Sequence, residues 1–266
     1  QRNTNGYNHA DSQGILDKDK EATLVVPFND TQALTDLFEV RGTEIACFIC
    51  EPVLGSAGFI PATQEFLQTA RQLTSRFGAL LVLDEIITGY RYCLGGVQQL
   101  YHVQADLTTY GKVIGGGMPM AAITGRADIM ELMSVKSSKR VWGSGGTFSA
   151  HPSSLIAGLA MMTYLHNHAA KVYPTLAHTA EILRNRIEET FANHHIIAKC
   201  TAHNDGPLQG SLASVYFPKE RDWNPLNAEE MLNPAYCNAN LREKLLRLGM
   251  LLNDVNVAHG FGALST

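Results

Sequence analysis

The sequence has no excess of positive charge and no long apolar run. Its 266 residues carry 21 Lys and Arg against 25 Asp and Glu, a formal net charge of −4. A nucleic-acid-binding surface needs clustered positive charge, whereas these cations are scattered along the chain, so that class of partner is excluded. No apolar run approaches the roughly 18 residues of a membrane span, and no signal-peptide pattern is seen. We therefore expect a cytoplasmic protein without a membrane partner.

Cysteine is also scarce. Five cysteines, an odd number without regular spacing, exclude a disulfide scaffold. Cys47 and Cys50 form a C-x-x-C pattern, but they lie in an apolar stretch expected to be a strand, where residues three apart point to opposite faces. This spacing disfavours a shared metal or a redox disulfide, and no metal site is predicted.

A glycine-rich central stretch with ionisable residues at two strand ends is the main feature that is present. Asp84 ends the apolar run 80–83, and Lys112 follows the short run 107–110. A carboxylate and an amine held in this way suit pyridoxal phosphate, because a lysine holds its aldehyde and an acid keeps its ring nitrogen protonated. The glycines at 115–117 would let backbone approach a ligand, and we expect Lys112 to be partly desolvated. Taken singly, Asp84 can equally be a helix N-cap and Lys112 a solvated charge.

The dipeptide Gly111-Lys112 also matches the end of a Walker-type nucleotide-binding motif. The other positions do not fit, because Asp106 stands where the motif needs glycine and Val113 stands where it needs Ser or Thr. The glycines follow the lysine instead of preceding it. Nucleotide binding of this type is excluded.

The apolar periodicity predicts alternating strands and helices. The clearest helix covers residues 63–77, with Thr63 as its cap and Gly78 as its stop. A strand, a helix and a second strand in this order make a crossover unit, so we expect an α/β fold with a mainly parallel sheet. The other expected strands lie at 22–26, 44–50, 79–83, 106–109, 121–124, 214–217 and 250–252, and the other main helices at 31–38, 152–165, 175–192 and 235–248.

Three motifs carry a resemblance to a known family. LDEIITGYR at 83–91, ADLTTYGKVIGGGMP at 105–119 and GGTFSAHP at 145–152 resemble the class III, fold type I, pyridoxal-phosphate aminotransferases, above all the glutamate-1-semialdehyde 2,1-aminomutases. The similarity extends upstream through FNDTQALTDLF and EPVLGSAGFIP and downstream to HGFGALST. It implies a large cofactor-binding domain at 1–166, a smaller C-terminal α/β domain at 167–266, and a homodimer. The family's N-terminal phosphate loop and its last helix have no counterpart here, so we expect the chain to be a fragment.

The resemblance also implies roles for individual residues. Lys112 would hold the cofactor and move protons, Asp84 would bind the ring nitrogen, and Ile86 would pack on the ring face. Thr147 would reach the phosphate of a cofactor bound by the neighbouring subunit. The alternative for Thr147 is that it and Ser149 cap the following helix.

Three further positions match the family less directly. Glu51 corresponds to a glutamate near the substrate, and its alternative is a solvated loop carboxylate. Ser56 occupies a place where relatives carry a polar residue near the cofactor's phenolic oxygen. Tyr7 resembles an aromatic residue that stacks on the cofactor, with a spacing that is off by one.

The implied reaction acts on a small amino or keto substrate and converts glutamate-1-semialdehyde to 5-aminolevulinate for tetrapyrrole synthesis. Tyr110 and the variant GTFSAHP also resemble aminotransferases attached to polyketide and peptide synthases, which leaves another substrate open. A second alternative is a fragment without catalytic activity.

Overall fold

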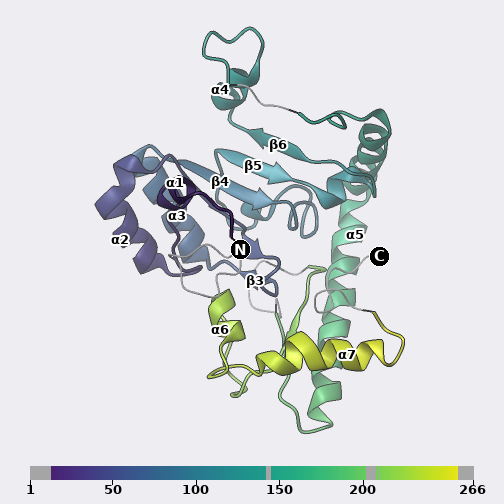
Figure 1. Ribbon diagram of the computed structural model, residues 1–266. Coiled ribbons are helices and arrows are strands. Elements are labelled where there is room, and N and C mark those ends of the chain that lie inside the picture. The colour runs from purple at the N-terminus through teal and green to yellow at the C-terminus, as the bar shows by residue number, and fades with distance from the viewer. Residues whose placement is uncertain (1–12, 142–144, 202–207, 209, 257–266) are drawn as a thin grey trace.

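The computed structural model describes residues 13–141, 145–201, 208 and 210–256 (Figure 1). Tyr7 and the segment HGFGALST lie outside the described residues. Among the helices that are described, none is both long and apolar enough to cross a membrane.

A four-stranded sheet forms the centre of the fold. Its order is β1 (Cys47–Cys50), β4 (Leu80–Glu85), β5 (Leu107–Tyr110) and β6 (Ala122–Gly125). The first three strands are parallel, and β6 pairs antiparallel with β5. The predicted α/β architecture with a mainly parallel sheet is confirmed.

One face of this sheet is covered by α3 (Gln64–Phe77), which contacts β1 and β4, and α2 (Thr31–Arg41) packs against α3. The chain enters α2 through Asp30, whose side chain accepts a hydrogen bond from the Ala33 N–H. Likewise Thr63 caps α3, and Gly78 ends it in the left-handed conformation with φ 75°. The helix predicted at 63–77 is therefore confirmed together with both of its end signals.

The two faces of the sheet differ in burial. Leu81 and Leu83 of β4 are fully buried against the apolar sides of α2 and α3. On the opposite face Ile49 of β1 and Ile123 of β6 are 58% and 56% exposed. The expectation of a buried strand at 44–50 was wrong, because β1 begins only at Cys47 and, among the described residues, pairs on one side alone.

A single helix of 41 residues, α5 (Pro152–Ala192), replaces the two helices predicted at 152–165 and 175–192. In Figure 1 it runs down one side of the molecule, from the sheet toward α7. Pro174 lies inside it without ending it. The predicted domain boundary at 166 and 167 falls within this helix, and the division into two domains stays a prediction.

The remaining elements are short. Two small antiparallel sheets pair β2 (Val53–Leu54) with β3 (Ile60–Pro61) and β7 (Lys199–Cys200) with β8 (Val215–Tyr216). The strands predicted at 22–26 and 250–252 were wrong, since residues 23–27 have no regular structure and α7 extends to Leu251. The other helical segments are α1 (Asp17–Glu21), η1 (Gly42–Glu44), η2 (Val97–Gln99), η3 (Lys112–Gly115), α4 (Ala127–Met130), η4 (Glu131–Met133), α6 (Ala228–Leu232), η5 (Leu241–Leu245) and α7 (Leu246–Leu251).

Candidate functional site

The parallel strands bring three of the predicted site residues to one edge of the sheet. Glu51 directly follows β1, Asp84 lies near the end of β4, and Lys112 comes two residues after β5. Because parallel strands end on the same side, their carboxyl ends form a common edge, which is where α/β sheets collect ligand-binding groups. The electrostatic influence of both Asp84 and Lys112 on Glu51 agrees with this arrangement.

Asp84 is held through one of its two carboxylate oxygens. Its Oδ1 accepts hydrogen bonds from the Ile86 N–H at 3.0 Å and from the Thr109 hydroxyl at 3.1 Å. Within the described part of the chain, Oδ2 accepts no hydrogen bond. The half-buried carboxylate is thus fixed in orientation and keeps one oxygen for a donor from a ligand. A helix N-cap role is not observed for Asp84, since its amide contact is a local turn at the end of a strand.

Lys112 begins the short turn η3 in an uncommon backbone conformation. Its φ is 50°, in the left-handed region that residues other than glycine rarely adopt. Such a conformation costs on the order of 1–3 kcal/mol, and it is typical of functional positions. The side chain is exposed in this chain, so the partial desolvation expected from the sequence is not observed. Within the described part of the chain, no segment covers the Lys112 side chain.

The turn that carries Lys112 rests against the first part of α5 through glycines. A Cβ at Gly158 of α5 would lie 2.6 Å from the Ile114 carbonyl oxygen, and one at Gly116 would lie 2.4 Å from the Ala157 carbonyl oxygen. Only glycine permits backbone to approach backbone this closely. From the sequence, the glycines at 115–117 were expected to let backbone approach a ligand. In the structure, Gly116 instead lets η3 pack closely against α5.

Ile86 lies beside the segment that leads to Lys112. A Cβ at Gly111 would be 3.2 Å from Cγ2 of Ile86, so the missing side chain of Gly111 leaves room for this half-buried isoleucine. Ile86 therefore sits between the Asp84 turn and the Lys112 turn. Its position next to both residues fits the predicted contact with an aromatic ring held between them.

Glu51 contacts the turn that contains Ser56. The Glu51 side chain accepts a hydrogen bond from the Gly55 N–H at 3.0 Å, and Ser56 is the next residue, exposed in the same turn. Burial raises the pKa of Glu51 above its usual range, and the charge of Asp84 raises it further. The Gly55 hydrogen bond and the charge of Lys112 act in the opposite direction. Glu51 is thus not the freely solvated loop carboxylate that the sequence left open.

Thr147 lies in a turn before α5 and is exposed. Among the described residues, no side chain caps α5, whose N-cap residue is His151. The capping role that was the alternative for Thr147 and Ser149 is therefore not observed. Thr147 is available to a partner from outside this chain, and its phosphate contact stays a prediction.

Sequence reasoning missed Glu85, the neighbour of Asp84. Its side chain is fully buried and accepts hydrogen bonds from the Thr88 hydroxyl and from the N–H groups of Val97 and Gln98. A Cβ at Gly96 would come within 2.3 Å of Oε1 of Glu85, so glycine is required there. Adjacent strand residues face opposite sides, so Asp84 faces the candidate site while Glu85 anchors the loop 88–98. In the sequence, only the adjacent glycines at 95 and 96 indicate that this loop packs closely against another group.

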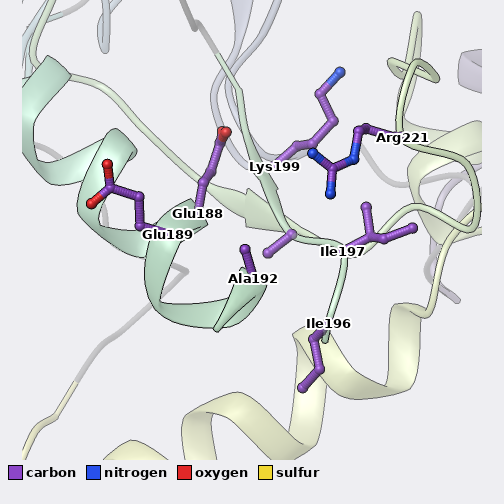
Figure 2. A pocket seen from close by; sticks show the side chains of 8 residues that line it. Glu188, Glu189, Ala192, Ile196, Ile197, Lys199 and Arg221 are labelled. Atoms are coloured by element: carbon purple, nitrogen blue, oxygen red, sulfur yellow. The ribbon is translucent and has the colours of Figure 1, made fainter. Parts of the chain in front are cut away.

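Two pockets lie away from this edge. One, of about 260 Å³, lies between the end of α5 and β7, and Figure 2 shows the cationic side chains of Lys199 and Arg221 on one side of it. Another, of about 470 Å³, is lined mainly by polar residues around Asn29 and Asn227. Neither is lined by Glu51, Asp84 or Lys112. We place the candidate site at the carboxyl ends of the parallel strands, because Asp84 and Lys112 lie there.

Comparison with known proteins gives a consistent result. The sequence model of the family described as aminotransferase class-III matches residues 11–251. The glutamate-1-semialdehyde 2,1-aminomutase of Hyperthermus butylicus is 36% identical over 246 residues, which cover 92% of this chain and 55% of that protein. The enzyme of the same name from Caldivirga maquilingensis is 43% identical over 176 residues, covering 66% of this chain and 40% of its own length. The chain thus spans about half the length of the curated relatives it matches.

Solved structures agree at the level of the fold. A β-phenylalanine aminotransferase from Variovorax paradoxus superposes with a TM-score of 0.77 at 33% identity, over 91% of this chain and 53% of that chain. An omega-transaminase from Sphaerobacter thermophilus gives a TM-score of 0.81 at 27% identity, over 96% and 55%. The fold type I expectation is confirmed. With a family match over most of its residues and an acid and a lysine at the ends of neighbouring parallel strands, the chain belongs to the class III aminotransferases.

Proposed function

We propose that this chain is part of a pyridoxal-phosphate-dependent enzyme that transfers amino groups, with glutamate-1-semialdehyde 2,1-aminomutase activity. The observation that carries the proposal is the placement of Asp84 near the end of β4 and of Lys112 just after the adjacent strand β5, with one carboxylate oxygen of Asp84 left for a ligand. The names of the relatives supply the substrate, and the reaction would convert glutamate-1-semialdehyde to 5-aminolevulinate, a step of tetrapyrrole synthesis.

The residues present fit this cofactor. Oδ2 of Asp84 would accept a hydrogen bond from the protonated ring nitrogen, Ile86 would pack against the ring, and Lys112 would hold the aldehyde carbon. Ser56, in the turn next to Glu51, would lie near the phenolic oxygen. Pyridoxal phosphate, when bound, supplies a protonated ring that withdraws electrons from the bonds around the substrate's amino-bearing carbon.

The chain's own groups would then handle protons and orientation. The Lys112 amine would take a proton from the substrate carbon and return one, as general base and general acid. Asp84 would keep the ring nitrogen charged, and the fixed Oδ1 would prevent its carboxylate from turning away. Glu51, whose pKa is raised chiefly by burial, would face the substrate end of the site.

A homodimer forms part of the proposal. Thr147 is exposed, and the turn around it carries Phe148, 80% exposed, while the first turns of α5 expose Ile156 and Leu159 at 69% and 70%. Exposed apolar side chains of this size are typical of a protein interface. We propose that this surface meets a second subunit, where Thr147 would bind the phosphate of that subunit's cofactor.

A cytoplasmic location is also proposed. All five cysteines are free, and the thiols of Cys50 and Cys200 have their pKa raised to about 12, chiefly by burial, which keeps them protonated. Unpaired cysteines are typical of proteins from reducing compartments.

The second candidate is an aminotransferase with another substrate, because the proteins in the two superposed structures are named as an aminotransferase and a transaminase. Tyr110, one of the two features that suggested it, pairs in register with Glu85 and packs on Tyr90 with ring centroids 5.7 Å apart. Its ring is therefore on the sheet face opposite to Thr109 and Asp84. This position gives no support to a role in substrate choice.

The proposal is tested by covalent trapping. The protein is incubated with pyridoxal phosphate, reduced with borohydride and digested, and the modified peptide is identified by mass spectrometry. We expect one main adduct at Lys112, its loss in Lys112→Ala, and its retention in Lys139→Ala, which removes an exposed lysine outside the site. Labelling spread evenly over the surface lysines would contradict the proposed site. Conversion of glutamate-1-semialdehyde, compared with amino-acid donors, then decides between the two reactions.

A further inference from the structure

The hydrogen bond between Thr109 and Asp84 joins two neighbouring strands at the candidate site. Asp84 and Thr109 are register partners in the parallel pair of β4 and β5. Their side chains therefore lie on the same face of the sheet, and the Thr109 hydroxyl donates to Oδ1 at 3.1 Å. Both donors that reach Asp84, this hydroxyl and the Ile86 N–H, use the same oxygen.

We propose that Thr109 is a positioning residue that acts on the cofactor through Asp84. This inference rests on the proposed function and adds to it a residue that the family motifs did not single out. The Ile86 N–H alone fixes Oδ1 at one point and leaves the carboxylate free to rotate about that contact. A second donor from the neighbouring strand fixes the plane of the carboxylate, so that Oδ2 faces the position of the ring nitrogen.

The choice of threonine has a physical reason. A hydrogen bond from a hydroxyl to an ionised carboxylate is stronger than one between neutral groups. A β-branched side chain has few rotamers in a strand, so its hydroxyl is already oriented. Valine has nearly the same shape without the donor, so Thr109→Val removes the hydrogen bond and leaves the packing of β5 in place.

The adjacent residue provides a matched control. Thr108 lies on the opposite face of β5, is buried, and its hydroxyl accepts a hydrogen bond from the Gln98 amide at 3.0 Å. Thr108→Val therefore makes the same chemical change in the same strand and removes one hydrogen bond without touching Asp84.

The test is the dissociation constant of pyridoxal phosphate, followed by absorbance or fluorescence titration. We expect Thr109→Val to weaken binding about fivefold, because a misoriented Oδ2 would lose a contribution to cofactor binding of the size of one ordinary hydrogen bond. Thr109→Ser keeps the hydroxyl and should restore affinity to within about twofold of the wild type. Thr108→Val should lower the melting temperature and leave the dissociation constant unchanged.

A double-mutant cycle shows whether Thr109 acts through Asp84. In the Asp84→Ala background, the side chain that accepts the Thr109 hydroxyl is gone, so Thr109→Val should weaken binding no further. Additive effects of the two substitutions, or a serine variant as weak as the valine variant, would overturn the inference. Wild-type protein that takes up no cofactor contradicts the proposed function itself. Normal uptake by both the wild type and Thr109→Val contradicts the Thr109 assignment alone.

Discussion

At the scale of single residues, Asp106 shows how a buried charge holds together the elements behind the site. Its carboxylate, 7% exposed, accepts hydrogen bonds from the Leu81 N–H at 2.7 Å, from Arg71 at 2.9 Å and from Arg126 at 3.0 Å. Burial by itself raises the pKa of Asp106, but these donors outweigh it and hold the pKa below its usual range. The residue therefore ties α3 and β4 to the segment after β6.

We expect Asp106→Asn to destabilise the protein by about 2 kcal/mol at neutral pH, because two arginines lose their charged acceptor. A carboxyl group with a lowered folded-state pKa stabilises the fold above its unfolded pKa and loses this contribution as pH falls through the folded value. The difference in the free energy of unfolding between wild type and variant, measured by urea unfolding, should therefore become smaller below about pH 4. Asp128→Asn is the control, since exposed Asp128 shares Arg126 and should have little effect. A difference that persisted unchanged at pH 2 would rule out the ionised form as its source.

The positions of Asp84 and Lys112 were predictable, because an apolar run before each residue indicated a strand. The structure places Asp84 near the end of β4 and Lys112 two residues after β5, and their roles toward a cofactor stay predictions. Thr109 and Glu85 were missed because their roles depend on register and on which face they occupy, which a single sequence does not show. The exposure of Lys112 was missed for a related reason, because local glycines do not reveal how open the edge of the sheet is.

At the scale of elements, the contact between η3 and α5 connects the proposed lysine to the longest helix. Gly158 is buried inside α5, and a Cβ there would meet the Ile114 carbonyl at 2.6 Å and Sδ of Met120 at 2.8 Å. Substitution by alanine normally stabilises a helix interior by about 1 kcal/mol. Here the clash with backbone prevails, because the carbonyl of η3 cannot move without displacing Lys112.

We expect Gly158→Ala to lower stability by about 1–3 kcal/mol and to weaken cofactor uptake together with it. Gly249 provides a control within another helix, α7, because a Cβ there meets nothing within 4 Å. Gly249→Ala should stabilise the protein by up to about 1 kcal/mol. Thermal unfolding of both variants checks the prediction, and a stabilised Gly158→Ala variant would contradict the described packing.

Element prediction was accurate where local chemistry sets the ends of an element. Thr63 and Gly78 define α3 by a cap and a left-handed stop. The same logic misled at the end of the helix predicted at 235–248, because Gly249, which directly follows it, lies inside α7 and is followed by two more helical residues. The join of two predicted helices into α5 was also missed, because packing at several points along its length overrides the local effect of Pro174.

At the scale of the whole molecule, the proposed subunit contact predicts an oligomeric state. We expect wild-type protein to sediment as a dimer and Leu159→Glu to shift it toward monomer, because a charge would be placed in the apolar surface at the start of α5. Leu252→Glu is the control, since Leu252 is 76% exposed just past the end of α7. A monomeric wild type at all concentrations would contradict the homodimer and with it the proposed role of Thr147.

The continuity of α5 also has a mechanical consequence. At about 1.5 Å per residue this helix is about 60 Å long, and it contacts η3 near one end and the apolar cluster around Val215 near the other. Pro174, near its middle, cannot donate to the Ala170 carbonyl, so the rod has one missing internal hydrogen bond and bends most easily there. From Pro174 to Ala192 the helix is about 27 Å long, so a bend of about 5° at Pro174 would move its C-terminal end by about 2 Å and leave η3 and Lys112 in place. The helix would thus behave as two segments joined at Pro174, with the first segment packed on the η3 turn that contains Lys112.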